Sequence, residues 1–95
     1  MTIHVQQTGT GEPMEFDVEV REGGSRTRHR VTMSRTTRAK LSGGKVDPEA
    51  LVRAAFEFLL ERESKESILA KFDVTVIARY FPEFEREISR YFVGS

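Results

Sequence analysis

The side chains best suited to metal or acid–base chemistry are two histidines, His4 and His29, and fifteen carboxylates. A zinc site needs three or four converging ligands, and the sequence has no cysteine and no His-x-x-x-His pair. His29 falls in an alternating stretch, where we expect a partly buried ring with one hydrogen bond. We therefore expect no bound metal and no cofactor.

Nucleophilic catalysis finds no better support. No serine lies in a Gly-x-Ser-x-Gly turn, and Gly43-Gly44-Lys45 lacks the leading glycine of a phosphate-binding loop. The carboxylates mostly fall on faces that we expect to be solvated, whereas a general acid or base needs a desolvated carboxyl. We identify no catalytic residue and expect that the protein is not an enzyme.

A basic stretch offers a different chemistry. Residues 21–45 carry eight Lys or Arg against one acid, although the whole chain has zero net charge. Such a stretch suits phosphate contacts that release counterions. Arg28 and Arg30, however, are expected to lie opposite Glu19 and Asp17 on a neighbouring strand. The candidate nucleic-acid-binding residues that remain are Arg35, Arg38, Lys40 and Lys45.

Aromatic side chains concentrate near the C-terminus, where six of the nine lie in the last 24 residues. Most are expected to be core residues. One short helix cannot turn all of them inward, so part of this segment is expected to be a contact surface enriched in Tyr, Phe and Arg. The candidate partner-binding residues are Arg79, Tyr80, Phe81 and Phe84.

The elements that would position these residues begin with a hairpin. Apolar and polar residues alternate over 14–21 and 26–34, on either side of Gly23-Gly24. Pairing residues whose numbers sum to 47 places both apolar sets on one face, with Val18 opposite His29. Residues 2–7 are expected to add a third strand.

Helices are expected to follow. Ser34 is a suitable N-cap for a short helix over 35–41, which Gly43-Gly44 would end. Asp47-Pro48-Glu49 starts a core helix that runs to about residue 63, with Glu49, Arg53, Glu57 and Glu61 as an exposed ladder of ion pairs. Short helices are expected after Ser64 and Pro82. The pattern over 72–77 fits either a helix or a strand.

The expected fold is therefore α+β, a β-hairpin or three-stranded meander covered on one face by three to five helices. We expect one domain over 1–95, with a β region at 1–34 and a helical region at 35–95. Apolar residues at 38% and charged residues at 32% are typical of a soluble domain. With no long apolar run and no signal-peptide pattern, we expect a cytoplasmic protein that does not enter membranes.

The segment Phe72-Asp-Val-Thr-Val-Ile-Ala-Arg-Tyr-Phe-Pro-Glu-Phe84 resembles a group of small uncharacterised bacterial proteins that share the pattern F-D-x-x-V-I-x-R-Y-F-P-E-F. That resemblance implies a free-standing bacterial domain and brings no activity. Residues 26–62 are similar in layout to ribbon-helix-helix DNA-binding proteins, whose strand pairs with its copy in a second subunit. Here the strand already has a partner in its own chain.

Two functions remain open from the sequence. The first is a non-enzymatic interaction or regulatory module that uses the 79–84 segment to bind a protein partner or a second copy of itself. The alternative is a nucleic-acid-binding regulator that uses residues 26–45.

Overall fold

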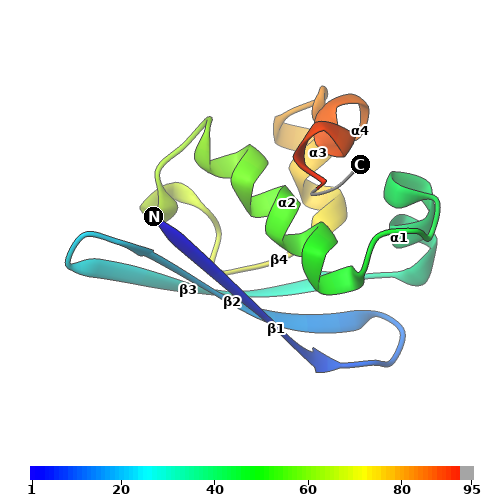
Figure 1. Ribbon diagram of the computed structural model, residues 1–95, viewed down its shortest axis with the longest axis horizontal. Coiled ribbons are helices and arrows are strands. Elements are labelled where there is room, and N and C mark those ends of the chain that lie inside the picture. The colour runs from blue at the N-terminus through cyan, green and yellow to red at the C-terminus, as the bar shows by residue number, and fades with distance from the viewer. Residues whose placement is uncertain (93–95) are drawn as a thin grey trace.

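Sheet and helices form two layers in the structure, a computed structural model that describes residues 1–92. One layer is a four-stranded sheet in the order β1-β2-β3-β4, and the helices lie on one of its faces (Figure 1). The fold is α+β, as the sequence predicts. The last three residues of the predicted domain, 93–95, lie outside the described residues.

The predicted hairpin is confirmed in its register. β2 (Met14–Glu22) and β3 (Ser25–Met33) pair antiparallel, with Met14 opposite Met33 and Val18 opposite His29. Gly23 in the turn has a φ of 61°, a value that glycine adopts without steric cost.

The third strand is also confirmed. β1 (Thr2–Gly9) pairs antiparallel with β2, and β2 therefore lies between β1 and β3. The meander predicted from the sequence is thus complete, with β1 at one edge of the sheet.

A fourth strand forms where the sequence left a helix and a strand open. β4 (Lys71–Asp73) pairs in parallel with β3 and places Phe72 opposite Val31. The segment that fitted either a helix or a strand contains both, because β4 is followed by the 3₁₀ helix η2 (Val74–Val76) and by α3 (Ile77–Tyr80). β4 lies inside the region that the sequence assigns to helices. Three residues are too few to show a period of two.

Both predicted helix starts are present. α1 (Arg35–Ser42) begins after Ser34, whose hydroxyl accepts a hydrogen bond from a backbone N–H in the first turn. α2 (Pro48–Leu60) begins after Asp47, whose carboxylate accepts a hydrogen bond from the backbone N–H of Glu49. Gly43 ends α1 in the left-handed conformation.

The ladder of ion pairs predicted along α2 does not form. Glu49 instead accepts the backbone N–H of Gln7 at 2.8 Å, and Glu61 accepts the Tyr91 hydroxyl at 2.8 Å. Arg53 and Glu57 have no ion pair within residues 1–92. Of these four residues, only Glu49 and Glu61 therefore have partners on other elements within the described chain, in place of the predicted ladder.

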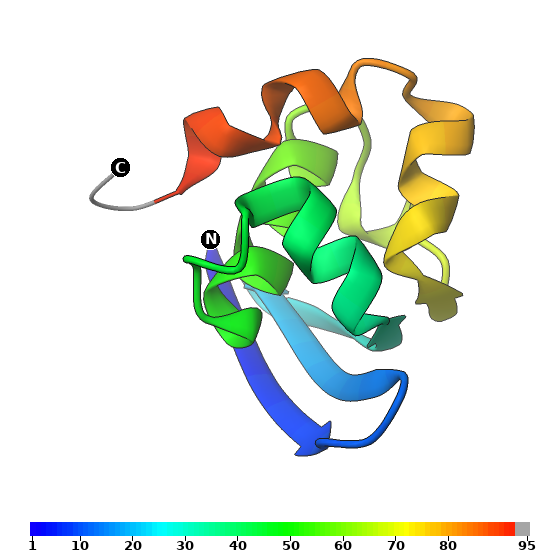
Figure 2. The same cartoon turned by 90° about the vertical axis from the view of Figure 1, so that its right-hand side faces the viewer.

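Short helices complete the helical layer. They are η1 (Lys65–Ser67), α4 (Phe84–Glu87) and η3 (Ile88–Tyr91). Figure 2 shows α4 and η3 on the side of α2 that faces away from the sheet, whereas η1 contacts β3. No helix within residues 1–92 is long and apolar enough to cross a membrane.

The core lies between the inner face of the sheet and α2. Its largest fully buried side chains come from the strands, from α2 and from the C-terminal helices; they include Phe16, Met33, Leu51, Phe56, Phe58, Phe84 and Ile88. Burial of these side chains is the main source of stability for the fold.

His29 connects this core to the segment that leads into β4. Its ring is buried against Phe56, with 5.3 Å between the ring centroids. Nδ1 lies 2.8 Å from the carbonyl oxygen of Leu69, and Nε2 lies 2.9 Å from the Thr27 hydroxyl. A carbonyl only accepts, so Nδ1 carries the proton. His29 thus makes two hydrogen bonds, where we expected one.

Candidate functional site

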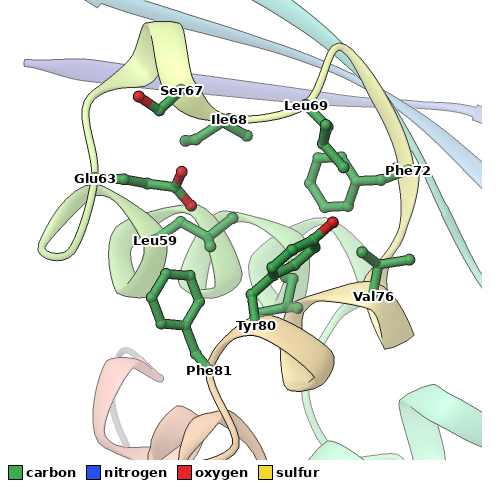
Figure 3. Close-up of a pocket in the computed structure, with 10 residues that line it drawn as sticks. Leu59, Glu63, Ser67, Ile68, Leu69, Phe72, Val76, Tyr80 and Phe81 are labelled. Atoms are coloured by element: carbon green, nitrogen blue, oxygen red, sulfur yellow. The ribbon is translucent and has the colours of Figure 1, made fainter.

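A partly open pocket of about 230 Å³ lies beside β4, between the end of α2 and α3 (Figure 3). Its walls come from α2, η1, β4, η2 and α3 and from the segments that join them, all within residues 59–81. The lining is almost entirely apolar and consists of Leu59, Glu63, Ser67, Ile68, Leu69, Phe72, Val76, Ile77, Tyr80 and Phe81. An apolar cavity of about 150 Å³ holds benzene, so this pocket has room for one large apolar side chain.

Two apolar side chains at this pocket remain open to solvent. Tyr80 is 68% exposed and Leu69 is 48% exposed. In Figure 3 the Tyr80 ring lies over the cavity, with its hydroxyl directed toward Leu69. Exposed large apolar groups beside a concave surface are typical of a site that another molecule covers.

Glu63 is the one charged side chain among the described residues that line the pocket. Figure 3 shows its carboxyl directed into the cavity, toward the space between Leu59 and Ile68. The carboxyl makes no hydrogen bond or ion pair within residues 1–92. Burial in these apolar surroundings raises the pKa of Glu63. The pocket therefore combines an apolar wall with one partly buried carboxyl that has no partner within residues 1–92.

The structure separates the four predicted partner-binding residues. Arg79 and Tyr80 are exposed on α3, and Phe81 is half-buried and lines the pocket. Phe84 is 1% exposed and packs edge-on against Phe58, with 5.0 Å between centroids. The expectation that Phe84 belongs to an exposed surface is wrong. The chain leaves the helical conformation at Phe81, so Tyr80 and Phe84 lie on different helices and face different ways.

Sequence reasoning missed two residues of this site, Leu69 and Glu63. The sequence places Glu63 at the end of the core helix and Leu69 in the short helix expected after Ser64. Their shared position depends on β4, which brings the chain after η1 back against α3. No pattern within either segment alone indicates that they meet.

Most of the predicted nucleic-acid-binding residues are engaged inside the chain. Arg38 donates to the carbonyl oxygens of Val46, at 3.0 Å, and Gly44, at 3.4 Å. Lys40 forms an ion pair with Glu85 at 3.1 Å.

The remaining two candidates, Arg35 and Lys45, differ in whether their side chains have a partner. The Arg35 guanidinium donates to the carbonyl oxygen of Thr10 at 2.9 Å. Lys45 is exposed and its side chain has no ion pair within residues 1–92.

The arginines of β3 lie on the outer face of the sheet among carboxylates. Arg30 pairs with Asp17 at 3.4 Å, as predicted. Glu19 lies opposite Arg28 in the register but makes its ion pairs with Arg21, at 2.6 Å, and Arg26, at 3.6 Å. The hydrogen bond from Arg21 is the largest cause of the lowered pKa of Glu19. The carboxylates thus offset much of the positive charge on this face.

A second, more polar pocket of about 380 Å³ lies on the same outer face, where β1, β2 and β3 contribute His4, Gln6, Asp17, Glu19, Arg28 and Arg30. Within residues 1–92 no three His, Cys, Asp or Glu side chains come together as they would around a metal ion. The ion pairs already described account for the carboxylates of this pocket.

No family model, curated protein or solved structure matches this chain. The resemblance to small bacterial proteins and the likeness to ribbon-helix-helix proteins therefore stay predictions. In the structure β3 is paired on both sides, with β2 and with β4.

Proposed function

We propose that the protein is a non-enzymatic interaction module that binds a protein partner at the Tyr80 pocket, the cavity lined by Leu69, Tyr80, Phe81 and Glu63. The observation that carries the proposal is that an exposed apolar rim and a partly buried, unpaired carboxyl share one cavity within residues 1–92. The cavity is smaller than the roughly 300–1,000 Å³ typical of sites for drug-sized ligands. Its size suits a side chain of a partner instead.

The chemistry of the pocket specifies the kind of side chain. An aromatic ring or a leucine would bury the exposed parts of Tyr80 and Leu69 and gain the free energy of apolar burial. A Lys or Arg beside it would reach Glu63 and form a charge-assisted hydrogen bond with its carboxylate. We propose a partner segment in which a large apolar residue lies next to a basic one.

Selection from a displayed library of short random peptides tests this function. We expect the selected peptides to contain an aromatic residue or leucine adjacent to Lys or Arg. Tyr80→Ala should weaken their binding by about 30-fold, as expected for an anchor residue. Glu63→Gln should weaken it by about tenfold, because a charge-assisted hydrogen bond becomes a neutral one.

Tyr91→Phe is the matched control, since it alters a tyrosine that does not line the pocket. Its peptide affinity should equal that of the unaltered protein. Selected peptides that lack the apolar–basic pattern, or that bind Tyr80→Ala with full affinity, would contradict the proposal.

The nucleic-acid alternative is tested by titrating labelled protein with a mixed DNA and RNA pool. Backbone amide shifts confined to residues 26–45 that persist at physiological salt would support it. We propose it only as the second function, because Arg35, Arg38 and Lys40 already bind groups of their own chain.

A further inference from the structure

β1 is an edge strand, and within residues 1–92 no strand pairs with its outer side. The N–H of Gln7 bonds to the Glu49 carboxylate at 2.8 Å, so it points away from β2. Backbone groups alternate in direction along an antiparallel strand. Ile3 and Val5 therefore also point their N–H and C=O groups outward, away from the sheet.

The pairing of β3 with β4, at the other edge of the sheet, gives the same direction for the backbone groups of β1. The Arg30 N–H bonds to Ala70, toward β4, at 2.8 Å. Asp17, opposite Arg30, must then point its backbone groups toward β1, where it lies opposite Gln6. Gln6 is thus bonded within the sheet, and its odd-numbered neighbours are not.

This edge lacks the usual protection against pairing. Exposed edges in natural proteins are blocked by charged residues, prolines or bulges. Thr2–Gly9 contains no Lys, Arg, Asp, Glu or Pro, in a chain with 32% charged residues. The irregularity in β1 lies between Gln7 and Gly9, at one end of the strand. The remaining edge is regular and uncharged.

We infer that β1 pairs antiparallel with β1 of a second copy of the chain, across a twofold axis at His4. The Gln7 N–H is occupied by Glu49, so the backbone groups left for pairing are those of Ile3 and Val5. The register that uses both places Ile3 opposite Val5 of the partner subunit. In that register His4 lies opposite His4 of the partner subunit on the outer face.

The positions of two charged side chains on α2 agree with a twofold axis at His4. α2 lies along β1 and runs in the opposite direction (Figure 1). Counting from the Glu49–Gln7 contact, Arg53 lies about 6 Å and Glu57 about 12 Å along the helix. The axis at His4 lies about 10 Å from Gln7 along the strand.

The axis therefore falls between Arg53 and Glu57. Each Arg53 comes to face Glu57 of the partner subunit, and the two side chains have no ion pair within their own described chain. An isologous interface requires this kind of self-complementarity.

The dimer joins two four-stranded sheets into one continuous sheet with all helices on the same face, because the axis is perpendicular to the sheet. The Tyr80 pocket lies beside β4, at the far edge from β1. Dimerisation leaves both pockets open, so this inference does not depend on the proposed function.

Sedimentation of the full chain across micromolar to millimolar concentrations tests the inference. We expect a reversible dimer. His4→Lys and His4→Glu should each raise the dissociation constant about tenfold or more, because like charges meet at the axis. An equimolar mixture of the two variants should form a heterodimer with restored affinity.

The helix pair gives a second test if a strand variant fails to fold. Arg53→Glu should weaken the dimer, and adding Glu57→Arg to that variant should restore it. Arg79→Glu makes the same charge change on α3 and should leave the dimer intact. A monomer at all concentrations, a dimer indifferent to the His4 and Arg53 variants, or a dimer lost with Arg79→Glu would each overturn the inference.

Discussion

Arg62, Glu63 and Lys65 are charged neighbours at the end of α2 with three different environments. Arg62 forms ion pairs, Glu63 lies partly buried in an apolar pocket, and Lys65 is 5% exposed with its ammonium group 2.7 Å from Glu66. The sequence places Arg62 and Glu63 at the end of the core helix and Lys65 in the short helix expected after Ser64, and it does not distinguish their environments. Their environments depend on segments that fold back from elsewhere in the chain.

Glu63 should reduce the stability of the protein at neutral pH. Burial raises the pKa of Glu63, so the folded state holds this proton more tightly than the unfolded state does. Its contribution to stability is present at pH values below the unfolded pKa and is lost as pH rises through the folded pKa. Glu63→Gln removes this loss. We expect the melting temperature of the variant, relative to the unaltered protein, to increase from about pH 4 to pH 7.

Thermal melts followed by circular dichroism at a series of pH values measure this difference. Glu15→Gln is the control, because Glu15 is exposed on the outer face of the sheet. A difference in melting temperature that stays constant with pH would show that ionisation of the Glu63 carboxyl does not reduce the stability of the fold. A more stable Glu63→Gln that binds peptide less well would be the pattern expected of a binding residue.

Among the contacts between elements, those of Arg62 link the end of α2 to α4. Its guanidinium contacts Glu83 and Glu87, each at 3.2 Å, and donates to the Phe58 carbonyl oxygen at 3.0 Å. It also lies 3.6 Å from the centroid of the Phe58 ring. α4 is one turn long, and this contact fixes it against α2.

Arg62→Ala should lower the free energy of unfolding by about 1–3 kcal/mol, because partly buried acceptors lose their donor. Arg62→Lys should recover little of that loss, since an ammonium group cannot bind both carboxylates and cover the ring. Urea unfolding measures both. Arg86→Ala is the control, as Arg86 is exposed and 3.8 Å from Glu87; an equal loss in this variant would contradict the role given to Arg62.

The hairpin and α2 could be predicted because their signals are local. Alternation around Gly23-Gly24 fixes a register, and Asp47-Pro48 fixes a helix start. The pattern over 72–77 left a strand open but could not give the bounds or the parallel pairing of β4, because a three-residue strand is defined by its neighbour β3. The buried position of Phe84 was missed for a related reason, since the break after α3 redirects the chain.

In the molecule as a whole, several charged side chains link elements that are distant in the sequence. Lys40 connects α1 to Glu85 of α4, and Arg35 connects α1 to the loop after β1. The sequence indicated a basic surface here, because it shows the charge of each residue and not its partner. For the pocket, the sequence supplied Tyr80 and Phe81, and the fold supplied Glu63 and Leu69.

The parallel pairing of β4 with β3 also governs the order in which the protein folds and opens. The two strands are about 40 residues apart, so closing this contact costs more chain entropy than closing the hairpin. β4 is three residues long, and we expect it to detach from the sheet while the meander stays intact.

Adjacent amides should report this partial opening. The Arg30 amide, bonded to Ala70 at 2.8 Å, should exchange its hydrogen faster than the Val31 amide, which points toward β2. Native-state hydrogen exchange distinguishes them, and equal rates would mean that β4 opens only with the whole domain. A peptide in the Tyr80 pocket should slow exchange at Arg30 alone. Since β4 forms one wall of that pocket, the protein would lose its binding site before it loses its fold.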